Sequence, residues 1–244
     1  MIKPFAFISC SFFCQVGFSQ SESIITDRPD ITESAVVVPA GWLQLEHGFQ
    51  YSDYNSPIVD YATTLVRWGL NAHTELRLAY APSIELHENL KGETVLQMQS
   101  FSMGLKNILY SGNYINCAAI SSGGSTITRE EEDLYADPNF ELLIAAAADI
   151  NQFWTLSVNT GGTLSGDDGY VKIPFSVSNG IALGDQFGYF AELFIEDLTD
   201  FEASVDMGFT YLINPNIQVD ISGGYQFDYD VPFISTGFAY RFDL

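Results

Sequence analysis

Apolar and polar side chains alternate along most of this chain. In the stretch 61–81, one parity carries Trp, Leu, Val and Tyr side chains, and the other carries two Arg and one Glu among small residues. Successive side chains of a β-strand point to opposite faces, so strict alternation predicts strands. The polar stretch 71–74 interrupts the pattern with turn-forming residues. This region is therefore predicted to be a β-hairpin.

The same alternation recurs from residue 41 to the end of the chain and predicts twelve strands. Their expected ranges are 41–52, 59–70, 74–84, 97–109, 113–121, 139–149, 152–161, 171–183, 187–195, 201–213, 216–226 and 232–242. Two classes of connection alternate between them. The tight ones are 71–73, 110–112, 150–151, 184–186 and 214–215, and the longer, mostly acidic ones are 53–58, 85–96, 122–138, 162–170, 196–200 and 227–231.

This arrangement of connections predicts the class of fold. Short turns at one end and longer loops at the other are typical of a transmembrane β-barrel, with its turns in the periplasm and its loops outside. An up-and-down barrel closes when its first strand pairs with its last, which leaves no exposed edge. The prediction is an all-β, antiparallel, up-and-down transmembrane barrel of about twelve strands.

The charges on the predicted strands separate a membrane barrel from a soluble one. Twelve charges of the predicted wall fall on the parity opposite the apolar one: Glu46, Arg67, Glu75, Arg77, Lys106, Glu141, Lys172, Glu192, Glu202, Asp206, Asp220 and Arg241. A lipid-facing Arg or Lys costs about 2–4 kcal/mol at the membrane midplane. A soluble barrel would instead fill its interior with Val, Ile and Leu. His47 departs from the pattern, because it lies on the apolar parity.

Composition and the first residues point to export. Apolar residues make up 47% of the chain and charged residues 16%, against about 25% in ordinary soluble domains. Residues 1–19 have a lysine, an apolar run and small residues before the expected cleavage point, which is typical of a signal peptide. A lipidated Cys10 is an alternative end of the signal. Beyond residue 19 the chain has no apolar run of the roughly 18 residues that a membrane helix needs.

The net charge and the few cysteines and histidines restrict the partners and the chemistry that are expected of the chain. The formal net charge of −22 argues against nucleic acid, because phosphates would be repelled. Only Cys117 remains after signal cleavage, so no disulfide framework is expected. The three histidines, His47, His73 and His87, have no evident nucleophile and carboxylate beside them, so no catalytic residues are assigned. Neither a cofactor nor a metal site is predicted.

Several motifs resemble one family. ITDRPDITES at 25–34 and VPAGWLQLEHGFQY at 38–51 are similar to the opening of the MetA-pathway of phenol degradation family of bacterial outer-membrane transporter barrels. Further similar stretches are 65–80, 104–109, 191–194, 208–225 and 235–242. The resemblance implies an outer-membrane location and transport of small organic compounds, and its C-terminal strand resembles the signal read by the barrel-assembly machinery. It implies no catalytic residues.

Two groups of charged residues are the candidate permeation site. The predicted lumen belt consists of Glu46, Arg67, Glu75, Arg77, Lys106, Glu192, Asp206, Asp220 and Arg241. Such a ring can filter permeants by charge, or its members can pair across the lumen and plug it. Asp27, Arg28, Asp30 and Glu33 form the second group, which could fold into the periplasmic mouth as a constriction or could simply anchor a turn.

The expected organisation is a signal peptide at 1–19, an N-terminal periplasmic or lumen segment at 20–40, and a transmembrane barrel at 41–244. The expected function is passive passage of small, partly apolar or aromatic organic compounds across the outer membrane of a Gram-negative bacterium. The partners expected are outer-membrane lipid, the small permeant and the assembly machinery. The alternative is a barrel with a closed lumen, whose acidic loops bind a partner or support the envelope.

Overall fold

The structure, a computed structural model, describes residues 23–28, 31–86, 96–130, 133–166 and 169–244. The predicted signal peptide, the candidate site residue Asp30 and the loop histidine His87 lie outside these ranges. Within them the fold is built of β-strands, and no helix is long and apolar enough to cross a membrane.

Thirteen strand segments follow one another along the described chain. They are β1 (Trp42–Ser52), β2 (Ile58–Asn71), β3 (Thr74–Glu85), β4 (Leu96–Ser111), β5 (Ile115–Glu130), β6 (Asp133–Asn151), β7 (Trp154–Ser165), β8 (Tyr170–Lys172), β9 (Phe175–Ala182), β10 (Phe187–Ile195), β11 (Ala203–Asn214), β12 (Ile217–Gln226) and β13 (Val231–Asp243). All the pairings between them are antiparallel.

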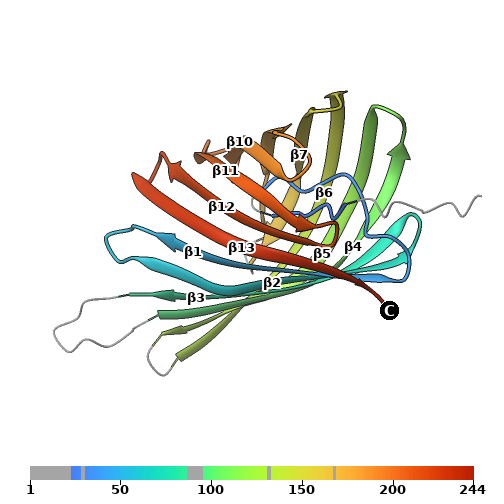
Figure 1. The fold of residues 1–244 in the computed structure, drawn as a ribbon. Helices are drawn as coiled ribbons and strands as arrows, with labels where there is room; N and C mark the ends of the chain where they lie inside the picture. Colours follow the sequence, from blue (N-terminus) through green and yellow to red (C-terminus); the bar gives the residue numbers. More distant parts are fainter. Residues whose placement is uncertain (1–22, 29–30, 87–95, 131–132, 167–168) are drawn as a thin grey trace, which may run out of the picture.

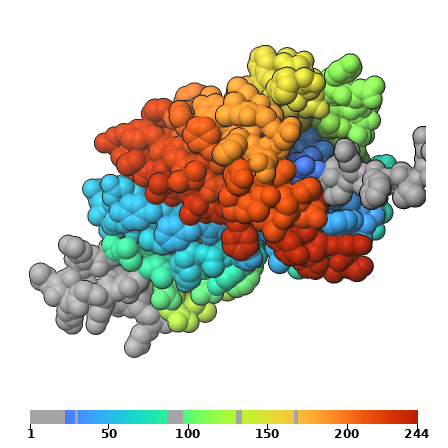
Figure 2. Space-filling view, in the orientation of Figure 1, coloured from blue at the N-terminus to red at the C-terminus, as the bar shows by residue number. Residues whose placement is uncertain are grey.

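The strands form a closed ring of twelve wall positions. β8 and β9 both pair with β7, so these two segments occupy one position in the wall. Each other strand pairs with its neighbours in sequence, and β1 pairs with β13 to close the ring. Figure 1 shows this ring, and Figure 2 shows blue β1 lying against the red strands along the closing seam. The predicted all-β, up-and-down barrel is confirmed.

The two faces of the wall differ as the charge pattern predicts. Large apolar side chains point outward and remain exposed, including Phe101, Met103, Met207, Phe209, Ile221 and Phe238. The inward charges Glu46, Arg67, Glu75 and Lys106 are fully buried. Apolar residues outside and charged residues inside are the reverse of a water-soluble barrel, and they suit a wall surrounded by lipid.

Met103 allows a direct test of this orientation. Its side chain is 62% exposed on the outer face of β4. We expect Met103→Arg to lower the free energy of unfolding in lipid vesicles by about 2–4 kcal/mol, because the guanidinium must enter hydrocarbon. Met103→Leu, which keeps an apolar side chain of similar volume, should cost less than about 1.5 kcal/mol. Equal stability of the Arg and Leu variants in a urea titration would contradict the assignment of this face to lipid.

The predicted long loop at 122–138 is wrong for most of its length. β5 continues to Glu130 and β6 begins at Asp133, and the two strands stay in register to their ends, where Glu130 opposes Asp133. Alternation fades in this part of the sequence because a strand that extends beyond the lipid meets water on both faces. An apolar outer parity is then no longer required, and the sequence signal for the strand disappears.

Two smaller predictions also need correction. The single strand expected at 171–183 is broken at Ile173 and Pro174, because proline has no N–H to donate to the ladder. Asp197 bridges this break, since its Oδ1 accepts a hydrogen bond from the Ile173 backbone N–H at 3.2 Å. Glu202, expected on the wall, lies just before β11 and accepts a hydrogen bond from the hydroxyl of Tyr229.

Candidate functional site in the barrel lumen

Residues 23–28 and 31–41, here called the N-terminal segment, lie inside the ring of strands (Figure 1). The segment starts at the short-turn end, where the Ile24 N–H donates to Pro215 O at 2.8 Å. It returns to the same end, where the Gly41 N–H donates to Gly69 O at 2.8 Å. A side chain at Gly69 would overlap the backbone carbonyls of the segment, so glycine allows this close approach. The N-terminal segment is therefore a loop that enters and leaves the lumen through one mouth.

The segment also crosses the lumen from wall to wall. On one side the Val38 N–H donates to the Glu75 carboxylate of β3 at 2.7 Å. On the other side the Thr32 N–H donates to the Glu192 carboxylate of β10 at 2.7 Å, and the Thr32 hydroxyl donates to Ser176 Oγ at 2.7 Å. These contacts join opposite walls through the segment, so the segment is a crossbar within the lumen.

Asp27 is the centre of the ionic contacts on the β2–β4 side. Its Oδ2 lies 3.1 Å from Arg67, 2.5 Å from Arg77 and 2.8 Å from Lys106. Its Oδ1 accepts the Ser34 N–H at 2.9 Å. Burial opposes ionisation of this carboxyl, but the three cations outweigh burial and hold its pKa well below the usual value. Asp27 is thus a buried carboxylate that is kept charged by its surroundings.

Two carboxylates of the wall complete this basic cluster. Arg67 donates to Glu75 at 2.9 Å and to Glu46 at 3.1 Å, and Arg77 donates to Glu75 at 3.0 Å. The wall alone therefore provides three cations and two carboxylates. The charge left over is neutralised by Asp27, which belongs to the N-terminal segment.

Glu33 brings a second acidic group of the segment to the same cations. Its carboxylate lies 2.6 Å from Arg77 and 3.2 Å from Lys106. Burial raises the pKa of this carboxyl to about 7, with Asp27 adding to the shift while Arg77 and Lys106 oppose it. A carboxyl of the undocked segment would titrate near its ordinary pKa of about 4.3.

This difference in pKa predicts that docking of the segment depends on pH. The docked state binds the Glu33 proton more tightly than the undocked state, so docking is strongest below about pH 4.3 and weakens as the pH rises to 7. Asp27 does not contribute to the pH dependence of docking in this window, because its lowered pKa keeps it ionised. We expect the open probability in planar bilayers to rise between pH 5 and 8, and Glu33→Gln to flatten the curve. A falling curve would contradict this.

The opposite wall is acidic. Glu192, Asp206 and Asp220 are all buried on the inner face of β10–β12. Arg28 reaches this wall from the N-terminal segment, and its Nη2 lies 3.2 Å from Asp220 Oδ1 and 3.1 Å from Ser235 Oγ. The lumen thus has cations on one side, carboxylates on the other, and segment residues of opposite charge facing each.

The structure brings most of the predicted site residues into one charge layer, defined here as Asp27, Arg28, Glu33, Glu46, Arg67, Glu75, Arg77, Lys106, Glu192, Asp206 and Asp220. Arg241 lies apart from it. Its guanidinium is 5.0 Å from the centre of the Trp42 ring and donates to Asn216 near the short-turn end.

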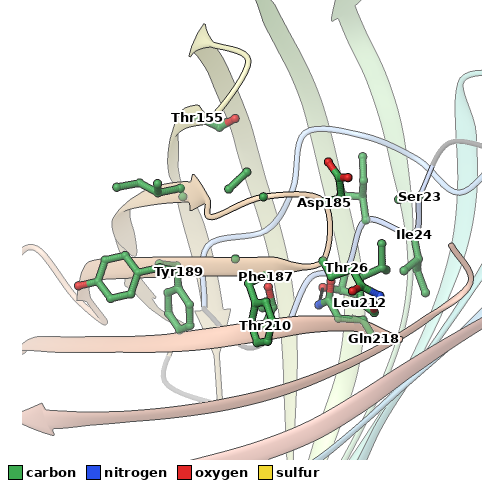
Figure 3. Close-up of a pocket in the computed structure, with 18 of the residues that line it drawn as sticks. Ser23, Ile24, Thr26, Thr155, Asp185, Phe187, Tyr189, Thr210, Leu212 and Gln218 are labelled. Atoms are coloured by element: carbon green, nitrogen blue, oxygen red, sulfur yellow. Dashed lines mark hydrogen bonds between the residues drawn. The ribbon is translucent and has the colours of Figure 1, made fainter. Parts of the chain in front are cut away.

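A pocket of about 450 Å³ lies on the short-turn side of the charge layer. Its floor is the segment from Ser23 to Thr26, and its walls are the short-turn ends of β9–β12. Figure 3 shows Ile24 and Thr26 beside Leu212 and Gln218, and the Gln218 amide donates to the Thr26 hydroxyl at 2.8 Å. We call this the short-turn chamber.

A second pocket of about 370 Å³ lies on the loop side, between Ile31 and Glu33 of the segment and the loop ends of β6–β10. This loop-side chamber is lined by apolar side chains such as Leu143 and Phe194 and by charged ones such as Glu141 and Lys172. Its mixed lining and volume are of the kind that binds a small, partly apolar molecule.

Apolar residues on the inner face are a feature that the sequence reasoning missed. Ala35 of the segment packs against Ile120 and Ala145, and these three side chains are buried. Phe190 and Phe194 are buried on the inner parity of β10, beside Glu192. The signal was available in β10, whose inner parity reads Phe, Glu, Phe and is not uniformly polar.

The structure explains why His47 lies on the apolar parity. Its Nδ1 lies 2.9 Å from the Thr64 hydroxyl, and its ring packs 4.9 Å from the Phe238 ring. The Thr64 hydroxyl donates to the Ala62 carbonyl at 2.8 Å, so it accepts its bond from the imidazole. A histidine that donates to a hydroxyl is not arranged to remove the proton of that hydroxyl. His47 and Thr64 therefore satisfy each other's polar groups on the outer face of the wall.

No group of three or more His, Cys, Asp or Glu is arranged to hold a metal ion within the part of the chain described here. Cys117, a free thiol, alternates with the inward, buried Ala118 and so lies on the outer parity of β5. His73 lies in the β2–β3 turn, where its N–H donates to Asn71.

The closed wall, the apolar outer face and the charged lumen together define the fold of outer-membrane β-barrel proteins. Sequence comparison adds nothing more specific, because no protein-family model and no curated protein matches the chain. The resemblance to the MetA-pathway of phenol degradation family therefore has no support from a family model.

Solved structures with the same fold include channels and an enzyme. The COG4313 outer membrane channel from Pseudomonas putida F1 superposes with a TM-score of 0.60 and 10% identity, over 85% of this chain and 98% of that chain. The KdgM porin in complex with disordered oligogalacturonate gives 0.54 and 8%, over 81% and 99%. Outer membrane phospholipase A from Escherichia coli gives 0.52 and 11%, over 84% and 91%. At these identities the likeness extends to the fold alone.

Proposed function

We propose that this chain is an outer-membrane channel through which small organic compounds of partly apolar or aromatic character pass without energy input. The observation that carries the proposal is the lumen, in which two chambers lie on either side of a layer of charged side chains. The channels among the structures of the same fold support it, as does the resemblance of residues 25–34 and 38–51 to the MetA-pathway of phenol degradation family, of which we propose the chain is a member.

The charges of the lumen restrict the class of permeant. Among the described residues, the charge layer holds four cations and seven carboxylates, a formal charge of −3. Such a layer repels a compound that carries several negative charges. The channel therefore differs in expected selectivity from the KdgM porin, whose solved complex contains the acidic oligogalacturonate. Neutral compounds and compounds whose positive and negative charges cancel remain as the expected permeants.

The proposal includes the route to the membrane. Residues 1–19 would direct export and be removed, and the barrel-assembly machinery would insert the barrel into the outer membrane of a Gram-negative cell.

Catalysis is not part of the proposed function, although the phospholipase shares the fold. The arrangement of His47 and Thr64 gives no activated nucleophile.

The experiment is a conductance and uptake measurement on the mature chain. In planar bilayers we expect discrete ion-conducting steps. In a strain that lacks other channels, we expect expression of the chain to increase uptake of phenol and not of oligogalacturonate. Preferred uptake of oligogalacturonate would refute the expected selectivity. Absence of both conductance and phenol uptake would refute the channel.

One observation favours a second function. The N-terminal segment joins opposite walls through Glu75 and Glu192, and such a crossbar would also suit a closed barrel that serves the envelope or binds a partner through its loops. The same bilayer experiment separates the two, because a permanently closed barrel gives no conducting steps at any pH.

A further inference from the structure

The basic side of the charge layer is built to hold an anion. Arg67 and Arg77 are directly opposite each other in the β2–β3 register, and like charges in that position repel. Lys106 of β4 adds a third cation, and all three side chains are buried. The wall supplies only Glu46 and Glu75 in compensation. The wall lacks one negative charge, and the Asp27 carboxylate supplies it through contacts to all three cations, whereas Glu33 of the segment contacts only Arg77 and Lys106.

The acidic side of the charge layer satisfies the Arg28 guanidinium less completely than the basic side satisfies the Asp27 carboxylate. The Arg28 guanidinium lies where side chains at Gly48 and Gly237 would be, and these glycines are opposite each other in the β1–β13 register. Its Nη2 contacts Asp220 Oδ1 at 3.2 Å. Arg28 Nε, Asp220 Oδ2 and Ser222 Oγ are buried without a hydrogen-bond partner among the described residues. Asp220 and Ser222 are each 5% exposed, so this half of the layer has unused, buried acceptors.

The two halves are filled by consecutive residues of one peptide. Asp27 brings a carboxylate to the cations of β2–β4, and Arg28 brings a guanidinium to Asp220 of β12. The walls therefore surround a unit with one negative and one positive group a few bonds apart. The same walls, with Asp27 and Arg28 withdrawn, would present complementary charges to any small molecule of that kind.

We propose that the charge layer is a binding site for small zwitterions that carry one carboxylate and one amidinium or ammonium group, and that Asp27 and Arg28 occupy this site as an internal ligand. This proposal rests on the proposed channel function, for which it names a class of permeant. The chambers on either side hold the apolar body of such a molecule. The internal ligand competes with the permeant, and its incomplete contacts at Asp220 allow displacement.

The test is calorimetric binding to the mature barrel in detergent. The probe is the dipeptide N-acetyl-Asp-Arg-amide, and the control probe is N-acetyl-Asn-Gln-amide, which has nearly the same shape and no charge. The proteins are the wild type, Asp27→Asn/Arg28→Gln, which removes both charges of the internal ligand, and Asp149→Asn, which changes an exposed carboxylate on β6 outside the layer. A difference in gel mobility between unheated and heated samples verifies that each barrel is folded.

We expect the double variant to bind the charged dipeptide at least about tenfold more tightly than the wild type, because a competing internal ligand lowers apparent affinity. Asp149→Asn should bind like the wild type, and Lys106→Met in the double-variant background should weaken binding at least about tenfold. Equal affinity of the wild type and the double variant would overturn the proposal, and so would equal binding of the neutral dipeptide or no binding to a folded double variant. If the double variant does not fold, Arg28→Gln alone is tested with the same criteria.

Bilayer recordings on the same proteins separate this proposal from the channel function. Dipeptide binding without conductance in any protein would refute the channel and leave the binding site. Conductance without dipeptide binding would refute the binding site and leave the channel.

Discussion

Asp27→Asn is expected to shift the lumen strongly towards its open state. The substitution keeps the shape of the side chain but removes the carboxylate that contacts Arg67, Arg77 and Lys106 together. Removing one partner of a buried ion pair costs about 3–5 kcal/mol. Each 1.4 kcal/mol changes an equilibrium roughly tenfold, so the docking equilibrium of the N-terminal segment should fall by at least about a hundredfold. Single-channel recordings in planar bilayers measure this as a rise in open probability.

The matched control for this variant is Ser23→Ala, which changes an exposed residue at the start of the same segment. It should leave the open probability unchanged. If Asp27→Asn behaves like Ser23→Ala, the ionic contacts of Asp27 do not hold the segment in the lumen.

Arg67→Met is expected to give the largest loss of stability in the barrel wall. The Arg67 side chain is fully buried and forms ion pairs with Asp27, Glu46 and Glu75 at 2.9–3.1 Å. It also donates to the carbonyls of Ile25 and Val36 in the segment. Methionine fills a similar volume but leaves three carboxylates close together without this cation. We expect the free energy of unfolding to fall by about 3–5 kcal/mol, measured by denaturant titration of the barrel in lipid vesicles.

Two further variants show whether charge or shape causes this loss. Arg67→Lys keeps the charge but lacks the planar fork that contacts two carboxylates at once, so it should recover only part of the stability. Arg129→Met removes a cation from an exposed position near the loop end of β5 and should change stability by no more than about 0.5 kcal/mol. A stable Arg67→Met barrel would show that these carboxylates do not depend on Arg67.

The wall could be predicted from the sequence because one physical requirement acts on every residue that meets lipid. Met103 and Phe209 must be apolar, and Arg67 and Lys106 must not face hydrocarbon, so parity alone identifies the inner face. That requirement ends where a strand leaves the membrane. Alternation therefore predicts a loop at the ends of β5 and β6, where the structure has paired strands. The break at Pro174 has a local signal in the sequence, because proline lacks the N–H that a strand needs. The alternation across 171–183 nevertheless predicts one continuous strand.

The interior of the site was less predictable. Parity shows that Arg77 and Asp220 point inward, but it does not show which charge of the N-terminal segment meets which wall. Asp27 and Arg28 are adjacent in sequence, yet their side chains contact opposite walls because the segment runs through the lumen between these walls. Such a path depends on contacts between residues far apart in the chain, for which alternation along a single strand carries no information.

The path of the N-terminal segment also bears on how the barrel assembles. Closure of the ring requires β1 to find β13, a pairing between opposite ends of the chain that is slow because of its large loop-closure entropy. Since both ends of the segment lie at one mouth, the loop can fold into a ring that has already closed, without threading a free end. Insertion into the membrane therefore does not require the interior to be occupied first, and the two are separable kinetic steps.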